Sequence, residues 1–179
     1  IGLTHPEQFI GRVGDGDSLG GYIFKNNDLH IIIDVDSASV IGAADRAGIS
    51  DIRMESAIST IMDCEDSVAA VDGADKTLAY RNWLGLMKRD LSEAIVKGSE
   101  TFTRRLNADI TYTTAQGLPA HLKGRSLMLV RNVGHLMTTP AVLDQDGAEI
   151  GEGLLDALCT TMIAMHDLKR DGGNSQCGS

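Results

Sequence analysis

The sequence has few aromatic residues, few cysteines and no run of basic residues. Aromatic side chains make up 4% of the 179 residues, in an otherwise ordinary globular composition of 42% hydrophobic and 23% charged residues. The formal net charge is -9, which argues against a nucleic-acid-binding surface. The three cysteines, Cys64, Cys159 and Cys177, are odd in number and widely spaced. They predict reduced thiols in a cytoplasmic protein rather than a disulfide framework.

Several other signals are missing. No stretch is long and apolar enough to span a membrane, and no signal peptide opens the chain. The Gly/Asp-rich loop at 14–21 lacks the Gly-Lys-Ser/Thr that a phosphate-binding loop requires. There is no internal repeat or Pro-rich linker, and the length suits one domain.

Two short apolar runs that end in charge are the most informative feature present. Residues 59–67 read STIMDCEDS, and residues 126–135 read SLMLVRNVGH. Such runs are typical of parallel strands that are buried on both faces. Enzymes built from βα repeats place their chemistry at the carboxyl edge of the sheet, so both strand ends are candidate sites.

The acids Asp63, Glu65 and Asp66 follow the first run. Asp63 and Glu65 are two residues apart, so on a strand they share a face and Cys64 points to the other. Their mutual repulsion would raise one pKa unless a cation lies nearby. They could hold a divalent metal, face an acidic substrate, or simply be solvated.

Arg131 ends the second run and could supply that cation. A guanidinium suits a carboxylate or oxyanion better than an ammonium does, although a structural ion pair is the plain alternative. Cys64 is expected to be a small core residue, and His135 a structural hydrogen-bonding residue.

The rest of the chain alternates strands and helices. A hairpin is expected at 22–35 and others at 110–123 and 141–150, with a strand at 101–106. Short helices are expected near Thr4 and over 50–58. A longer helix capped by Asp72 should bury Leu78, Ala79, Trp83, Leu86, Met87 and Leu91, and a final helix should bury Leu154, Leu155, Leu158, Met162 and Met165.

Long motifs resemble the malate synthase G family. They are DCEDSVAAVD at 63–72, YRNWLGLM at 80–87, GRSL at 124–127 and RNVGHLMT at 131–138, with shorter matches at 25–30 and 152–156. The resemblance covers nearly the whole chain, but the family protein is several times longer. The chain is therefore expected to be an internal segment that is truncated at both ends.

The resemblance implies an α/β fold containing part of a (β/α)8 TIM barrel with an inserted α/β domain. Residues 1–58 and 89–125 would belong to the inserted domain, and residues 59–88 and 126–179 to the barrel. It also implies a cytoplasmic, monomeric full-length enzyme of the glyoxylate cycle. That enzyme condenses acetyl-CoA with glyoxylate and hydrolyses the thioester to malate and CoA.

Site residues carry over by position. The resemblance makes Arg131 the catalytic residue that contacts glyoxylate and steadies the enolate oxygen, with Asp63 and Glu65 beside it and beside the Mg²⁺ waters. Ser67 and Arg104 match positions that contact acetyl-CoA. The direct Mg²⁺ ligands and the catalytic base match no residue here, so the segment alone is expected to be inactive.

Two other functions stay open. One is a related barrel lyase that cleaves acyl-CoA thioesters with a similar Arg and acid pair. The other is a non-catalytic binding module that retains part of a barrel.

Overall fold

The computed structural model describes residues 2–14, 16, 20–54, 59–65 and 67–170. They fall into two units, residues 1–58 with 108–124 and residues 59–107 with 125–179. The segment 89–107 thus groups with 59–88, whereas the sequence predicted that it belongs with 108–125. The assignment of these pieces to a barrel and an inserted domain stays a prediction.

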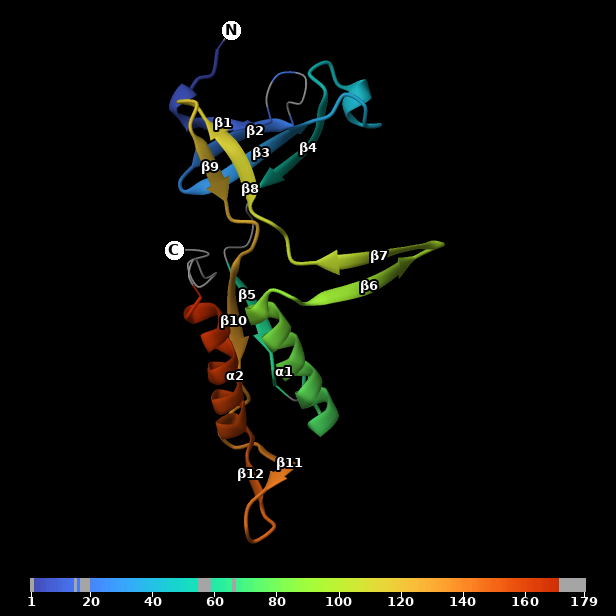
Figure 1. The fold of residues 1–179 in the computed structure, drawn as a ribbon, viewed down its shortest axis with the longest axis vertical. Helices are drawn as coiled ribbons and strands as arrows, with labels where there is room; N and C mark the ends of the chain where they lie inside the picture. Colours follow the sequence, from blue (N-terminus) through green and yellow to red (C-terminus); the bar gives the residue numbers. More distant parts are fainter. Residues whose placement is uncertain (1, 15, 17–19, 55–58, 66, 171–179) are drawn as a thin grey trace. The chain divides into compact units, whose positions relative to one another are not determined.

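The first unit is a six-stranded antiparallel sheet in the order β4-β3-β2-β1-β8-β9 (Figure 1). Its strands are β1 Phe9–Val13, β2 Gly21–Asn26, β3 Leu29–Val35, β4 Ile49–Met54, β8 Ile110–Thr114 and β9 Pro119–Leu122. The expected hairpins at 22–35 and 110–123 are confirmed. The expected helix over 50–58 is wrong, because residues 49–54 pair with β3 instead; residues 55–58 lie outside the described part.

Local turn chemistry explains the β2–β3 hairpin. Asn27 and Asp28 both have positive φ, at 49° and 64°, which a two-residue hairpin turn needs and which Asn and Asp tolerate. In the resulting register Ile23 lies opposite Ile32, and both side chains are buried. Turn and register together set the core of this unit. Near Thr4, the expected helix is only a 3₁₀ turn at Pro6–Gln8 with no side-chain cap.

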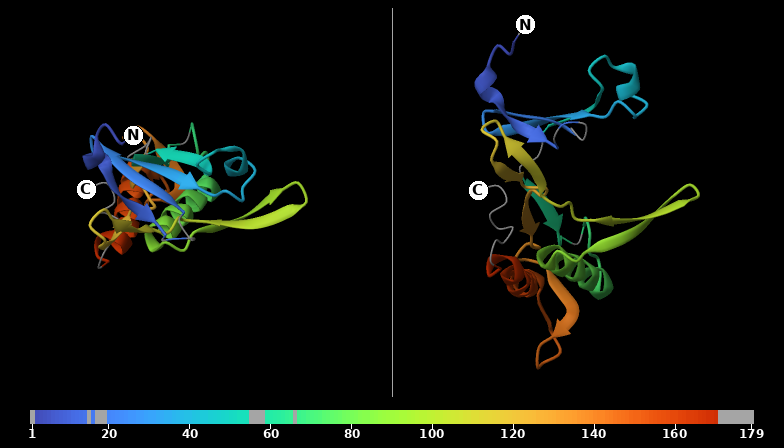
Figure 2. Two further views of the ribbon diagram at one scale, coloured as in Figure 1. Left: turned by 90° about the horizontal axis from the view of Figure 1, so that it is seen from above. Right: turned by 45° about the horizontal axis from the view of Figure 1, so that its top comes forward.

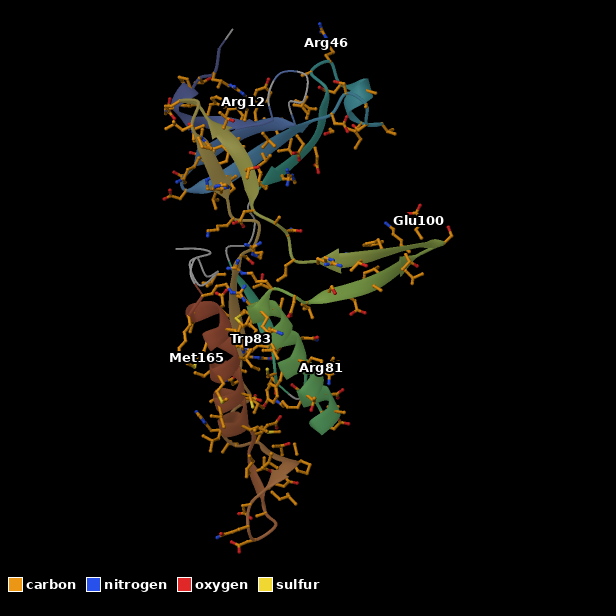
Figure 3. The ribbon with its side chains drawn as sticks, in the orientation of Figure 1. Arg12, Arg46, Arg81, Trp83, Glu100 and Met165 are labelled. Carbon is orange, nitrogen blue, oxygen red and sulfur yellow. The ribbon has the colours of Figure 1, made fainter. Side chains whose placement is uncertain are left out.

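The second unit contains two neighbouring βα segments. Strand β5 (Ser59–Asp63) leads to helix α1 (Gly73–Lys88), and strand β10 (Leu127–Arg131) leads to helix α2 (Glu152–Leu168). β5 and β10 are parallel neighbours, as expected. The two helices pack side by side in every view (Figure 2), and the Trp83 indole between them donates a 3.0 Å hydrogen bond to the Thr160 carbonyl (Figure 3).

Helix α1 begins and ends as local signals predict. The Asp72 side chain accepts hydrogen bonds from the amides of Ala74 and Asp75, both at 2.9 Å. The helix ends at Arg89, whose φ of 65° is left-handed. Trp83 is buried as predicted, but Leu78 is exposed and the stripe facing α2 starts with the buried Lys76.

Helix α2 buries the face opposite to the one predicted. Its buried residues are Glu152, Asp156, Thr160 and Asp167. Of the residues predicted to be buried, Leu155 is half-buried, and Leu154, Leu158, Met162 and Met165 are exposed. The prediction failed because a helix buries the face that meets a partner, and α1 presents polar partners. The apolar face has no cover among the described residues.

Two hairpins complete the second unit. β6 (Ser92–Lys97) pairs with β7 (Glu100–Arg105), and β11 (Thr138–Leu143) pairs with β12 (Glu149–Gly151). Strand β6 was not predicted, since it carries no apolar alternation. The fold is α/β with mostly antiparallel sheets, and the described strands close no barrel. Neither described helix is long and apolar enough to cross a membrane.

The Asp72 cap gives a stability prediction. Asp72→Ala removes the acceptor of two amide hydrogen bonds, and loss of such a cap typically costs about 1 kcal/mol. We expect the free energy of unfolding, measured by urea titration, to fall by about that amount. Asp72→Asn retains an acceptor and should lose much less. Equal losses in the two variants would contradict the capping role.

Candidate functional site

The parallel register brings the two charged strand ends together. Arg131, the last residue of β10, lies directly opposite Asp63, the last residue of β5. The Cys64 amide continues this ladder with a 2.9 Å hydrogen bond to the Arg131 carbonyl. Since carboxyl ends of parallel strands meet at one edge of a sheet, charges that are 68 residues apart in sequence become neighbours.

The Arg131 guanidinium is held by two carboxylates. Nε and Nη2 donate to the two oxygens of Asp63 at 2.8 and 2.6 Å, which is bidentate geometry. Nη2 also reaches Glu65 at 3.4 Å. Ser67 in turn donates its hydroxyl to Glu65 at 2.5 Å. The structure therefore joins four of the five predicted site residues: Asp63, Glu65, Ser67 and Arg131.

The group is charged and open to solvent. The Asp63 side chain is 25% exposed and that of Arg131 52%. Hydrogen bonding to Arg131 lowers the pKa of Asp63 below its ordinary value, and the same hydrogen bond raises the pKa of Arg131. Both groups are therefore ionised at neutral pH, and the acids have the cation that the sequence analysis required.

Strand alternation puts this group on one face of the β5–β10 pair. Asp63 and Ile61 share a face of β5, and Arg131 and Leu129 share a face of β10. Ile61 and Leu129 are exposed, so the two strands are not buried on both faces as predicted. The site lies on the face that the described residues leave open.

Cys64 takes the other side and is fully buried. Burial raises the pKa of its thiol to about 11, so the thiol is protonated at neutral pH and a poor nucleophile. This agrees with the expected core role.

Three other candidates lie apart from this group. Arg104 is on the exposed strand β7, opposite Glu93 in the hairpin register. It is not among the described contacts of Arg131, Asp63 or Glu65. His135 is exposed in the loop after β10. Asp66 lies outside the described residues.

A buried polar group that the sequence did not predict lies behind the strand ends. We call Lys76, Tyr80, Glu152 and Asp156 the Lys76 cluster. Lys76 Nζ lies 2.6 Å from Glu152 and 3.1 Å from Asp156, and Tyr80 donates to Asp156 at 2.5 Å. Lys76 is 2% exposed and Asp156 is 0% exposed. The signal for it was a pair of polar residues four apart on each helix, Lys76 with Tyr80 on α1 and Glu152 with Asp156 on α2.

Two members of the Lys76 cluster, Lys76 and Tyr80, have shifted pKa values. Burial alone would lower the pKa of Lys76, but the hydrogen bonds to Glu152 and Asp156 and the attraction of their charges together raise it. Burial and the hydrogen bond to Asp156 raise the pKa of Tyr80 well above its ordinary value. Lys76 is therefore an ammonium and Tyr80 a neutral hydrogen-bond donor at neutral pH.

The arrangement at Arg131 suits an anionic or carbonyl ligand better than a metal. The contacts described use Nε and Nη2, which leaves Nη1 to donate to a further oxygen. Both Asp63 oxygens are already bound by Arg131, and Glu65 accepts from Ser67. In the described part of the chain no group of three His, Cys, Asp or Glu residues could hold a metal ion. These residues do not form a Mg²⁺ site by themselves.

Comparison with known proteins gives close relatives, although no family model matches the chain. Malate synthase G of Halalkalibacterium halodurans is 49% identical over 179 aligned positions, which cover 99% of this chain. Malate synthase G of Corynebacterium efficiens and of Corynebacterium glutamicum are 50% and 48% identical over 163 positions, or 91% of the chain.

The matches cover only 25% of the first relative and 22% of each of the other two. The chain thus spans about a quarter of the length of these relatives. High identity over nearly the whole chain confirms the resemblance noted in its motifs: by sequence, the chain belongs to the malate synthase G family and corresponds to a segment of its members.

Proposed function

We propose that this chain is the part of a full-length malate synthase that carries its catalytic arginine. The reaction is the condensation of acetyl-CoA with glyoxylate, followed by hydrolysis of the thioester to malate and CoA. The proposal rests on one observation, the bidentate salt bridge between Asp63 and Arg131 at the carboxyl ends of two parallel strands. We further propose that β5–α1 and β10–α2 are neighbouring repeats of a TIM barrel, with the site facing its interior.

The role of Arg131 follows from its charge and planarity. In the condensation, the acetyl methyl group loses a proton to a base, and the enolate carbon attacks the aldehyde carbon of glyoxylate. Negative charge collects on the enolate oxygen and then on the new alkoxide. A fixed guanidinium next to these oxygens stabilises the charge without reorganising. It can also bind the glyoxylate carboxylate.

Asp63 and Glu65 set the orientation of that guanidinium. Two carboxylates on the Nε–Nη2 edge turn the Nη1 edge outward, where a substrate oxygen can accept from it. The hydroxyl of Ser67 restrains Glu65 and lies at the position proposed to meet acetyl-CoA. Arg104, on β7, is proposed as a contact for the anionic end of CoA.

The Mg²⁺ ion of the family would take its direct ligands from residues outside this chain. The base that removes the methyl proton is proposed to lie outside it as well. We also propose that the full-length enzyme is cytoplasmic and monomeric. The chain is 48–50% identical to malate synthase G over 91–99% of its length, which supports this function over that of a related acyl-CoA lyase or a non-catalytic module.

Arg131→Lys tests the proposal directly. A lysine keeps the charge but cannot reproduce the planar donor fork. Removing one oxyanion donor typically costs ~10²–10³-fold in kcat, and we expect a loss of that size in the full-length enzyme. The measurement is glyoxylate-dependent release of CoA from acetyl-CoA. Arg81→Lys, on an exposed position of α1, is the matched control and should retain activity. Wild-type turnover in Arg131→Lys would contradict the catalytic role proposed for Arg131.

The double variant Asp63→Asn, Glu65→Gln tests whether the two carboxylates orient the Arg131 guanidinium. Each amide presents donor hydrogens to a guanidinium that is itself a donor, so the guanidinium should lose its fixed orientation. Losses of this indirect kind are typically ~10–100-fold, and we expect that decrease in kcat with the melting temperature little changed. Asp90→Asn, Glu100→Gln, at exposed positions of the same unit, should be neutral. Unchanged kcat in the first variant would contradict the role of the acids.

The isolated chain should neither bind Mg²⁺ tightly nor turn over acetyl-CoA and glyoxylate. Too few oxygen ligands converge in the described residues for a dedicated site, and exposed apolar residues on β5, β10 and α2 favour association. We expect no saturable heat on Mg²⁺ titration and oligomers in light scattering, with the full-length protein as control. A monomeric chain that releases CoA in the presence of glyoxylate would overturn this prediction.

A further inference from the structure

The Lys76 cluster touches the backbone on both sides of the candidate site. Lys76 Nζ donates to the Cys64 carbonyl at 2.6 Å, and Cys64 is the residue between Asp63 and Glu65. Asp156 accepts a 2.8 Å hydrogen bond from the amide of Val133, two residues after Arg131. One buried ion pair therefore connects the end of β5 to the loop after β10.

Helix α2 makes further contacts with the same loop. The Thr160 hydroxyl donates to the Asn132 side chain at 3.2 Å. A Cβ on Gly153 would lie 2.8 Å from the Val133 carbonyl oxygen, closer than real side chains come, so only glycine lets α2 approach this loop. The residues after Arg131 are thus held by α2 through several independent contacts.

We propose that the Lys76 cluster positions the Arg131 guanidinium against Asp63 and Glu65 for the reaction. This inference rests on the proposed function. Lys76 and Asp156 are positioning residues: they touch no substrate, and they act by fixing the distance between the two strand ends. The bidentate Asp63–Arg131 contact requires that distance to be held to a fraction of an ångström, and the cluster crosses between the strand ends directly behind it.

Stability alone does not explain the cluster. Replacing a buried ion pair by apolar groups of similar volume is often neutral or stabilising, so packing of α1 on α2 does not need one. The cluster also has its full set of partners. Lys76 donates to Cys64, Glu152 and Asp156, and both Asp156 oxygens accept. A fully satisfied buried network rigidifies its surroundings, which is what a positioning role requires.

The test is the double variant Lys76→Met, Glu152→Gln in the full-length protein. It removes one positive and one negative charge, so the net charge of the cluster is unchanged, and Asp156 keeps Tyr80 and Val133. The link to the Cys64 carbonyl and the ion pairs of Lys76 with Glu152 and Asp156 are lost, so a lower melting temperature is expected as well. A misplacement of ~1 Å at a reacting group can cost ~10²-fold, and we expect kcat to fall by about that factor. The KM for acetyl-CoA should change little.

Two measurements separate positioning from folding. The kcat is taken per folded molecule, at a temperature well below the melting temperature of each variant. The crystal structure of the variant should show the two Arg131–Asp63 contacts lengthened or reduced to one. Asp167→Asn is the matched control, because Asp167 is buried on the same helix but pairs with Arg89 at the far end. It should lower the melting temperature and leave kcat per folded molecule and the Arg131 geometry unchanged.

Two results would overturn the inference. One is an unchanged kcat per folded molecule, and the other is a reduced kcat with the bidentate Arg131–Asp63 contact intact. If the double variant does not fold, Tyr80→Phe is used in its place, because it removes one hydrogen bond to Asp156. A several-fold fall in kcat with altered Arg131 geometry would support the positioning role. A wild-type kcat would overturn that role. If the wild-type full-length protein releases no CoA with glyoxylate, the proposed function fails, and the Arg131 geometry of the variants alone decides the positioning role.

Discussion

The parallel register of β5 and β10 is the constraint on which the rest of the second unit depends. It aligns Asp63 with Arg131, and a shift by one residue would turn one of these side chains to the helix side of the strands. Helix α1 follows β5 after a short loop, whereas α2 follows β10 only after the β11–β12 hairpin, so it is the contacts of Lys76 and Asp156 that bring both helices to these strand ends. The charged site and the buried Lys76 cluster are therefore two consequences of one strand pairing, on opposite faces of the same strand ends.

The two charge groups obey different electrostatics. Asp63 and Arg131 are half-open to water, where a salt bridge contributes little to stability, so the value of their contact is geometric. Lys76, Glu152 and Asp156 are removed from water, and breaking such a group by removing one partner is strongly destabilising. The buried group is thus the rigid one, and the exposed group is the one free to exchange partners with a ligand. Under the proposed function the site binds and releases anions, and this division suits that role.

The sequence predicted those elements whose signals are local. The apolar runs at β5 and β10, the Asp72 cap and the turn at Asn27–Asp28 each act within a few residues, and all are found in the structure. Strand β4 was predicted as a helix because its structure comes from pairing with β3, which lies far outside any local window.

The buried face of α2 was predicted wrongly for a related reason. A stripe of leucine and methionine indicates which face can be buried, but the partner decides which face is, and α1 offers Lys76 and Tyr80. The candidate site was predictable to the level of residues, since charge at two strand ends is visible in sequence. Its bidentate geometry and the supporting cluster depend on long-range contacts, such as Asp63 with Arg131 at 68 positions and Lys76 with Asp156 at 80.

The open face of β5 and β10 connects this geometry to the proposed reaction. Ile61 and Leu129 stand beside Asp63 and Arg131 on the same face, and all four are partly or largely exposed in the described structure. Any cover that buried the two apolar side chains would also withdraw the charged pair from bulk water. Electrostatic interactions strengthen as the effective dielectric constant falls, and preorganised donors act most strongly on developing charge where water is excluded. Under the proposed function, a cover over the apolar residues would therefore also strengthen the action of Arg131 on developing charge. This is why a strand pair with the correct residues already in contact is expected to do no chemistry while that face is open.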